Sequence, residues 1–132
     1  MMKNTVAIFL LLTSCASGTQ SAADDLAAQQ KYAQVAVYEP GSAITPPRLL
    51  KRVDPVAPEG FRESRTSAAA TVEAVIDASG KVVDAWYVDG DRDWARILAY
   101  TVRRWKFAPA TLGGEPIPVK LKITSTFEQS PR

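Results

Sequence analysis

The clearest pattern of apolar and polar residues lies near the C-terminal end of the chain. In residues 119–128, apolar or small side chains alternate strictly with charged and hydroxyl side chains. Successive side chains of a β-strand point to opposite faces, so this pattern predicts a strand with one buried and one solvated face. The inward set is Val119, Leu121, Ile123, Ser125 and Phe127, and the outward set is Lys120, Lys122, Thr124, Thr126 and Glu128.

A hairpin is predicted upstream of this strand. Residues 71–77 alternate between apolar and polar side chains, although Val75 interrupts the polar set, and residues 81–89 form the returning strand. Residues 77–80, which join the two strands, have the composition of a turn. Gly80 supplies the positive φ that a short hairpin loop commonly needs at its last position. Together with the C-terminal strand, this hairpin predicts a small antiparallel sheet.

An amphipathic helix is predicted between the hairpin and the last strand. Asp89 or Asp91 is a suitable N-cap, and the carboxylates of Asp91 and Asp93 suit the positive end of the helix dipole. Apolar side chains then recur at i, i+4, i+7, i+8 and i+11, which places them on one face that can pack on a sheet. These residues are Trp94, Leu98, Thr101, Val102 and Trp105, with Ile97 beside them.

A motif of aromatic and proline residues is predicted to close this helix. Trp105 and Phe107 are two residues apart and cannot share one face of a helix, so Trp105 fits its end and Phe107 the chain that leaves it. Pro109 supports this boundary, because helices usually stop at or before the residue that precedes a proline. The motif comprises Trp105, Phe107, Pro109, Ala110, Gly114 and Pro116.

This motif and its flanking strands resemble the TonB C-terminal domain family. In that family a short hairpin is followed by a helix ending in W-x-F-x-P-A, then a G-x-P turn and a last strand that ends in an aromatic residue, here Phe127. The resemblance covers about residues 46–128. It implies an α+β fold, in which a three-stranded antiparallel sheet carries one main helix on one face and residues 107–118 carry the chain back to the last strand. Most motif residues then identify the fold and pack its core.

The resemblance also implies features around the first strand. A short helix follows the proline-rich entry segment in the family, and residues 58–61 would open its counterpart. The family usually carries a glycine just before the first strand. Residues 68–70 are alanines here, which departs from the family pattern.

The returning strand of the hairpin does not keep one phase in the family pattern. Val82 and then Ala85 and Tyr87 would face inward, a slip of one residue that requires a β-bulge. Trp86 would then lie on the opposite face. Two interpretations of Trp86 stay open, namely cover by the proline-rich entry segment and contact with a partner.

The family's activity implies a binding function. TonB-type transducers carry force from an ExbB–ExbD motor in the inner membrane to outer-membrane receptors, and their C-terminal domain binds a short receptor peptide as an added strand. The resemblance therefore implies that residues 119–127 are a partner-binding edge strand for envelope proteins such as a TonB-dependent receptor, with a role in transmembrane transport. The chain lacks the transducers' spanning helix and long proline-rich spacer, so we expect a receptor-binding head without force transmission. A structural homodimer or a subunit of an envelope assembly is the alternative.

The start of the chain is interpreted as an export signal. Residues 5–12 are mostly apolar but too short to span a bilayer, which needs about 20 such residues. The sequence ending at Cys15 matches the lipobox of bacterial lipoproteins, in which the cysteine carries the acyl chains. We interpret residues 1–14 as a signal peptide and Cys15 as the site of lipid attachment. A plainly cleaved signal peptide is the alternative.

The remaining organisation follows from this interpretation. Residues 16–30 are small and polar, and residues 15–45 are assigned to the lipidated cysteine and a flexible tether. A short helix within residues 24–37, where the apolar spacing is loosely helical, is the alternative. Residues 46–130 are assigned to the TonB-like domain. Ala16 stands where an aspartate would usually signal retention at the inner membrane. We therefore expect a periplasmic protein that is held by lipid at the outer membrane.

Composition argues against an enzyme and against a nucleic-acid binder. The 132 residues include no histidine and one cysteine, so the commonest general base and commonest metal ligand are missing, and a Ser-His-Asp triad is excluded. Sixteen basic residues stand against fourteen acidic ones, a near balance that is atypical of proteins that bind nucleic acid. We expect no catalytic residues, no cofactor and no metal.

Three kinds of polar cluster in the sequence have the composition of a possible site. The D-x-D-x-D spacing at residues 89–93 is reminiscent of a calcium loop, but no glutamate closes a loop of the required length. The carboxylates along the hairpin fit turn and solvent positions. The basic clusters fit a solvated surface and the negative end of the helix dipole better than an anion site. The residues concerned are Glu73, Asp77, Asp84 and Asp89 for the carboxylates, and Arg48, Lys51, Arg52, Arg103 and Arg104 for the basic clusters.

Overall fold

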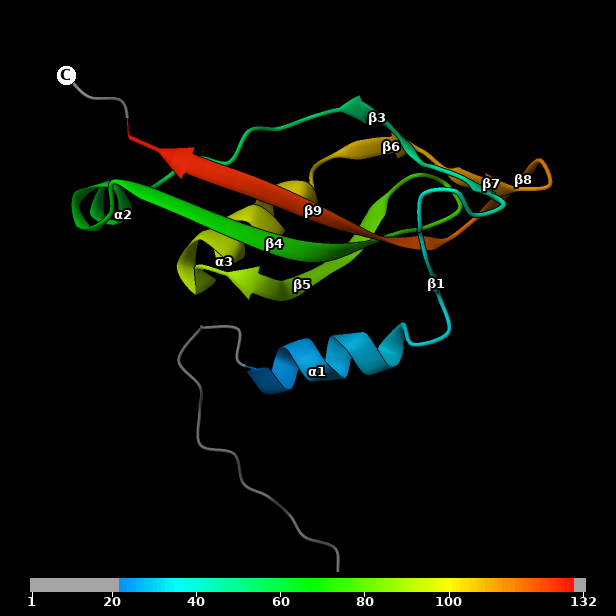
Figure 1. Cartoon of the computed structure of the whole chain (residues 1–132), viewed down its shortest axis with the longest axis horizontal. Coiled ribbons are helices and arrows are strands. Elements are labelled where there is room, and N and C mark those ends of the chain that lie inside the picture. The colour runs from blue at the N-terminus through cyan, green and yellow to red at the C-terminus, as the bar shows by residue number, and fades with distance from the viewer. Residues whose placement is uncertain (1–21, 130–132) are drawn as a thin grey trace, which may run out of the picture.

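A computed structural model of the chain describes residues 22–129. The predicted signal peptide and Cys15 therefore lie outside the described residues. Figure 1 shows three helices and nine strands in this described part. They are α1 (Ala22–Lys31), β1 (Ala36–Val37), β2 (Ile44–Thr45), β3 (Arg48–Lys51), α2 (Glu59–Ser64), β4 (Ser67–Ile76), β5 (Val82–Gly90), α3 (Arg92–Val102), β6 (Lys106–Ala108), β7 (Ala110–Leu112), β8 (Glu115–Ile117) and β9 (Val119–Glu128).

The main sheet has the strand order β1-β9-β4-β5. Strands β4 and β9 pair antiparallel over their whole length, from Ser67 opposite Glu128 to Ile76 opposite Val119, without a register shift. The hairpin partner β5 lies on the other side of β4. The predicted three-stranded sheet is thus correct for β4, β5 and β9 but wrong in number, because β1 adds a fourth strand, parallel to β9. A two-residue strand leaves no readable period in a sequence.

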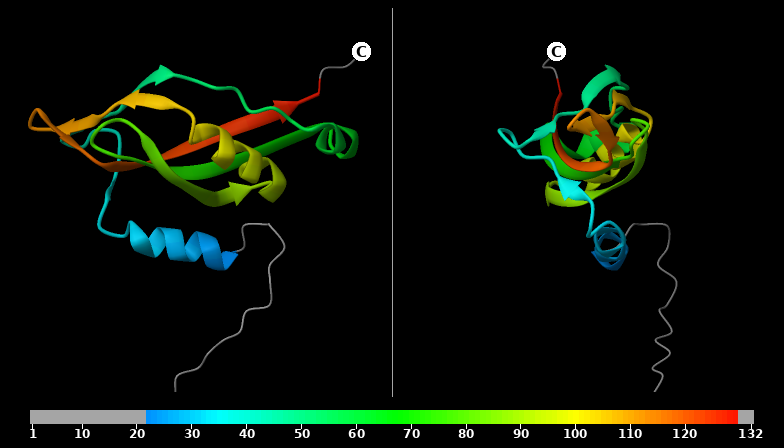
Figure 2. Two further views of the ribbon diagram at one scale, coloured as in Figure 1. Left: turned by 180° about the vertical axis from the view of Figure 1, so that it is seen from behind. Right: turned by 90° about the vertical axis from the view of Figure 1, so that its right-hand side faces the viewer.

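The core lies between the sheet and α3. Figure 2 shows α3 across one face of the sheet, and the apolar stripe predicted for the helix is buried there. Asp91 is the N-cap, as predicted, and its carboxylate accepts a hydrogen bond from the Trp94 N–H at 2.9 Å. At one end of the core, the rings of Phe61, Trp94 and Phe127 pack together with centroids 5.4–5.5 Å apart.

The helix ends earlier than predicted. Its last residue is Val102, because Thr101 and Val102 accept hydrogen bonds from the N–H groups three residues on, which turns the chain out of the helix. Trp105 is buried beyond this turn, and its indole N–H donates to the carbonyl of Val53 at 2.6 Å. Phe107 begins the departing chain in β6, as predicted. The proline-rich entry segment is thereby fixed against the core.

The link between α3 and β9 is not a plain long turn, and this prediction was wrong. Strand β6 pairs with β3, and β7 pairs with both β2 and β8, so two small sheets extend the domain beyond the main sheet. Gly113 and Gly114 connect β7 to β8, both with positive φ. Two consecutive residues of positive φ suit the turn of a tight hairpin.

The hairpin β4–β5 is predicted well. Gly80 has a φ of 91°, and a side chain there would collide with the backbone carbonyl of Phe107. The predicted phase slip on β5 is confirmed, since the ladder shifts register between Ala85 and Val82 and both side chains are buried in the core. The first strand begins earlier than predicted, at Ser67, so the three alanines lie within β4. The short helix implied after the entry segment is α2.

Trp86 is covered from an unexpected direction. It is only 1% exposed and lies on the sheet face opposite α3. The ring of Tyr32, just after α1, stacks on it with centroids 6.1 Å apart and an angle of 17° between the planes. Cover therefore comes from the segment that precedes the proline-rich entry, and not from that entry or a partner.

The predicted tether carries structure in its described part. Helix α1 and strands β1 and β2 occupy most of residues 22–45, and Figures 1 and 2 show α1 alongside β5, on the side of the sheet away from β9. The alternative prediction of a short helix within residues 24–37 is closer to the structure, because α1 overlaps this range. Because Asp25 is the one buried residue of α1, a search for an apolar face could not define this helix.

Candidate functional site: the outer edge of strand β9

Hydrogen bonds at the two ends of β9 fix the direction of its backbone groups. The N–H of Gln129 donates to the carbonyl of Thr66 at 2.9 Å, across the ladder to β4. The carbonyl of Lys120 instead accepts from the N–H of Tyr38 at 2.9 Å, on the outer side. Backbone groups alternate in direction along a strand, so odd-numbered residues of β9 face β4 and even-numbered residues face outward.

The outer side of β9 is paired only at its start. Strand β1 aligns with Val119 and Lys120, and within residues 22–129 no other strand pairs with this side. From residue 121 to the end of the strand, the outer edge is free in the described part of the chain. Its outward N–H and carbonyl groups belong to Lys122, Thr124, Thr126 and Glu128.

The inner side of β9 is held firmly. Its whole ladder to β4 is in register, and the hydroxyl oxygens of Thr71 and Thr124 lie 2.7 Å apart on the solvent face. Lys122 lies directly opposite Glu73, a pairing of opposite charges that stabilises a ladder modestly. On the core face Ile123 is buried. The free edge therefore belongs to an anchored strand without a bulge, whose outward backbone groups can pair with another strand.

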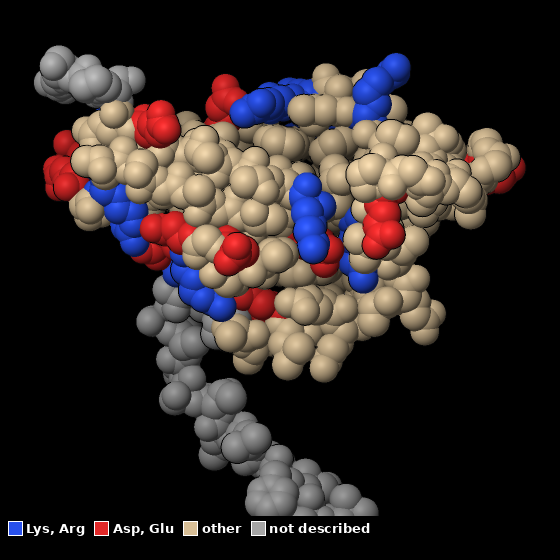
Figure 3. Space-filling model, viewed as in Figure 1, with Lys and Arg blue, Asp and Glu red and all other residues tan. Residues whose placement is uncertain are grey.

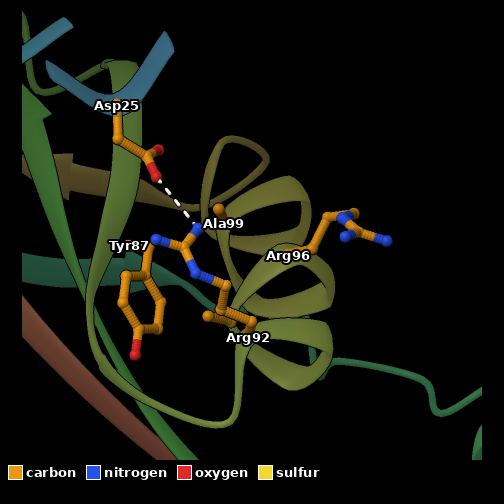
Figure 4. A pocket seen from close by; sticks show the side chains of 6 residues that line it. Asp25, Tyr87, Arg92, Arg96 and Ala99 are labelled. Carbon is orange, nitrogen blue, oxygen red and sulfur yellow. Dashed lines mark hydrogen bonds and ion pairs between the residues drawn. The ribbon is translucent and has the colours of Figure 1, made fainter. Parts of the chain in front are cut away.

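The opposite edge of the sheet is closed. Strand β5 carries two register shifts against β4, which leave Val83 and Val88 as extra residues. Helix α1 lies beside it, and Figure 4 shows Asp25 of α1 directed at Arg92 of α3, with 3.4 Å between carboxylate and guanidinium. The Arg92 guanidinium lies 4.2 Å from the ring centre of Tyr87, beside a cavity of only about 20 Å³. Bulges and a covering helix are standard protections of a sheet edge.

The predicted motif residues are structural in this geometry. Trp105, Phe107 and Ala110 are buried in the core, and Pro109 links β6 to β7. Gly114 and Pro116 lie in the β7–β8 hairpin, where both are exposed. The motif therefore positions the start of β9 and contributes no side chain to its outer edge.

Asp91 and Asp93, two acidic residues of the calcium-like spacing, form ion pairs with an arginine. Arg65, which follows α2, donates to Asp91 at 2.7 Å and to Asp93 at 2.8 Å, so this ion-pair network joins α2 to the start of α3. Burial raises the pKa of Asp91, but hydrogen bonds from the Trp94 N–H and Arg65 outweigh it and hold the pKa below its usual value. Across residues 22–129, no three potential metal-ligating side chains come together.

Asp77 is likewise part of a turn. Its carboxylate accepts hydrogen bonds from the hydroxyl of Ser79 at 2.6 Å and from the N–H groups of Ser79 and Lys81. The Ser79 hydroxyl bond is the main reason that the pKa of Asp77 lies below its usual value, with burial opposing it. This carboxylate is committed to the hairpin turn.

Two features of the site were missed by sequence reasoning. Tyr38 and the β1 residues before it occupy the start of the outer edge, and Tyr32 covers Trp86. The aromatic residues at these positions were the one available signal, because they stand in an otherwise small and polar segment.

Charge and hydrophobicity give no further site on the face that carries β9. Figure 3 shows acidic and basic side chains interspersed over this face, without a large area of one sign.

Among the helices of residues 22–129, none is long and apolar enough to cross a bilayer.

Comparison with known proteins supports the fold. No protein-family model matches the chain, and no curated protein sequence matches it. Among solved structures, the chain is similar to the solution NMR structure of the Pseudomonas aeruginosa TonB C-terminal domain, with a TM-score of 0.55 and 20% sequence identity. The match covers 70% of this chain and 93% of that domain. The chain thus has a TonB C-terminal-like α+β fold, and this likeness defines its architecture only.

Proposed function

We propose that this chain is a periplasmic, lipid-anchored TonB-like domain that binds extended segments of envelope proteins by strand addition. One observation carries the proposal, namely the outer edge of β9, which has no bulge and is free over residues 121–128 in the described chain, while the β5 edge is bulged and covered. A free edge offers backbone donors and acceptors to an extended peptide, and alternate side chains give selectivity. The role is binding without catalysis, related to TonB-type transport.

The fold supports the class of partner. TonB C-terminal domains bind envelope proteins such as outer-membrane receptors, and this chain shares their architecture. The side chains along the free edge are Lys122, Thr124, Thr126 and Glu128. They are polar, so backbone pairing would supply most of the affinity and a partner would need few specific side chains.

The first experiment locates the bound strand. Peptides selected from a displayed random library against the chain from Ala16 onward would be titrated while amide exchange is followed along β9. None of the contacts described above involves a residue before Ala22, so this shortened chain retains them all. We expect exchange at the outward amides of Lys122, Thr124 and Thr126 to slow on binding. Protection elsewhere, with these amides unchanged, would refute strand addition at β9.

The second experiment removes one backbone donor. Thr124→Pro deletes an outward N–H, so the variant should stay folded and lose most peptide affinity. Thr124→Ala keeps the N–H and is the matched control, with near wild-type affinity expected. Ile123→Pro deletes an inward N–H that pairs with β4 and should unfold the domain, as circular dichroism would show. A folded Thr124→Pro variant that binds as tightly as wild type would exclude the edge.

A homodimer paired through the same edge is the alternative occupant. Size-exclusion chromatography with light scattering on the chain from Ala16 onward separates the two cases. A monomer that binds peptide supports the proposal. A stable dimer that Thr124→Pro dissolves, and that binds no peptide, assigns the edge to self-association instead.

The lipid anchor is proposed from the lipobox ending at Cys15. Acyl chains contribute about 0.8 kcal/mol per buried CH₂, so a triacylated cysteine would hold the protein firmly on a membrane, and Ala16 favours the outer one. Cys15→Ala should release the protein into the soluble fraction and abolish incorporation of labelled palmitate. A Cys15→Ala variant that remains labelled and membrane-bound would disprove the anchor.

A further inference from the structure

Three lysines that are far apart in the sequence meet in one ladder. Lys51 of β3 lies directly opposite Lys106 of β6, and Lys81 forms a bridge to Lys106 from its other side. Residues directly opposite each other in antiparallel pairs share a face and have neighbouring Cβ atoms. All three are exposed, whereas the next residue, Phe107, turns to the core and is buried. Like charges in this arrangement destabilise a ladder, so the fold bears a cost here.

Nearby carboxylates offset the charge of this lysine ladder only in part, because Asp77 interacts electrostatically with Lys81. Among the described residues, none of the three lysines forms an ion pair, and neither does Arg104. Arg103 is different, because it pairs with Asp84 at 2.8 Å. In Figure 3, basic side chains stand along the rim where Figure 1 draws β3. In the described chain, the charges of Lys51, Lys106 and Arg104 therefore remain without an ion-pair partner.

A cavity of about 490 Å³ opens beside the ladder. Its charged lining residues are all cationic, and no carboxylate lines it. The rest of the lining is largely apolar and includes Leu50, which is 61% exposed, at the bulge of β3. The cations are Lys81, Arg103, Arg104 and Lys106.

We propose that the lysine ladder and this cavity bind the phosphate group of an anionic phospholipid at a membrane surface. The cations would hold the phosphate, and Leu50 would enter the apolar boundary of the bilayer. Three of the five cations of the ladder and cavity are lysines. The lysine ammonium is a mobile point charge without the bidentate geometry of arginine, which favours a surface with many phosphates over one defined peptide. Clusters of basic residues beside a membrane are attracted to anionic lipids in this way. The contact would orient the domain and leave the outer edge of β9 free.

The experiment measures binding of the chain from Ala16 onward, which carries no acyl chain, to phosphatidylcholine vesicles with and without phosphatidylglycerol. Wild type should sediment with the anionic vesicles alone, and less so as salt rises. The combined variant Lys51→Gln, Lys81→Gln and Lys106→Gln should lose at least about tenfold in partition coefficient. The matched control, Arg62→Gln, Lys120→Gln and Lys122→Gln, removes the same charge from other surfaces and should bind like wild type.

Two single variants keep the test independent of the ladder's folding. Arg104→Gln lies outside the strands and should weaken binding a few-fold, and Leu50→Ser should weaken it without changing the salt dependence. Thr124→Pro should bind vesicles like wild type, so failure here is distinguishable from failure of strand addition.

Three outcomes would overturn the assignment. Equal losses in the ladder variant and its matched control would mean diffuse attraction without a site. Displacement of wild type from anionic vesicles by dilute inorganic phosphate would assign the cavity to a soluble phosphate. Binding of an acidic peptide through the ladder, with no binding to anionic vesicles, would assign it to a protein partner.

Discussion

The two edges of the main sheet differ in how far they are protected from pairing with another strand. The β5 edge carries two extra residues and lies beside α1, which is joined to α3 by the ion pair of Asp25 and Arg92. The β9 edge keeps one register over its full length and is paired only at its first two residues. An unprotected straight edge is a hazard, because it can pair with another chain. A domain that protects one edge so thoroughly and leaves the other open has an edge suited to a partner.

The largest effect is expected from a core substitution, which destabilises the whole domain and therefore both edges of the sheet. Trp105 is 8% exposed and joins the core to the entry segment through Val53. Trp105→Ala should lower the free energy of unfolding by about 3–5 kcal/mol, the usual cost of truncating a buried aromatic residue. Denaturant melts of wild type and variant measure it. A loss below about 1 kcal/mol would contradict a core role for Trp105.

A smaller loss of stability is expected when only the closed β5 edge is altered. Tyr32→Ala removes the ring stacked on Trp86, and such aromatic pairs contribute about 0.5–1.5 kcal/mol. Amides of β5 should then exchange faster, while those of β9 that face β4 stay protected. Tyr32→Phe keeps the ring and serves as the control. Uniform acceleration over both strands would show that the two edges are not independent.

The stability of the region next to the closed β5 edge should also depend on pH. Asp91 begins α3 directly after β5, and its pKa lies below its usual value of about 3.9. A depressed folded-state pKa stabilises the fold above the unfolded pKa, and this contribution is lost as pH falls through the folded value. Asp91→Asn keeps a good N-cap but removes the charge, so it should cost less than about 1 kcal/mol at neutral pH. The difference from wild type should shrink as the pH falls below the usual carboxyl pKa and vanish once Asp91 is protonated in the folded protein, and a constant difference would contradict this account.

The smallest effect concerns the side chains of the open edge. Lys120→Ala and Lys122→Ala keep every backbone donor and acceptor, so peptide affinity should fall only a few-fold if backbone pairing dominates. Isothermal titration with a library-selected peptide measures the change. A hundredfold loss would mean that lysine contacts, and not the ladder, define the interaction.

Periodicity explains which parts of the fold were predictable. Strand β9 and helix α3 each repeat their pattern over ten residues or more, and both were located correctly apart from the last turn of the helix. The bulge on β5 followed from the resemblance. Helix α1 was predicted only as the alternative to a flexible tether, and strand β1 was not predicted, because neither has a buried apolar stripe. Their place depends on contacts with β5 and β9.

The candidate site was partly predictable. The alternation in β9 indicates a strand with a polar face, and the resemblance placed it at the edge. The sequence does not show which amides of β9 face outward, and the hydrogen bonds of Gln129 and Tyr38 in the structure were needed to establish this. The pairing of β9 with β1 likewise became visible only in the fold. The lysine ladder was beyond sequence analysis, because only strand register brings Lys51, Lys81 and Lys106 together.

The unbroken ladder between β4 and β9 has a mechanical consequence. A partner strand bound at β9 and pulled along its own axis would load that ladder in shear, so its many hydrogen bonds would share the tension instead of opening one after another. The tension would pass into β4, the central strand on which α3 packs. By contrast, β1 is held by a two-residue pairing, which would resist tension from the N-terminal side far less than the ten-residue ladder. The fold is thus reinforced along the path from an occupied edge to the core.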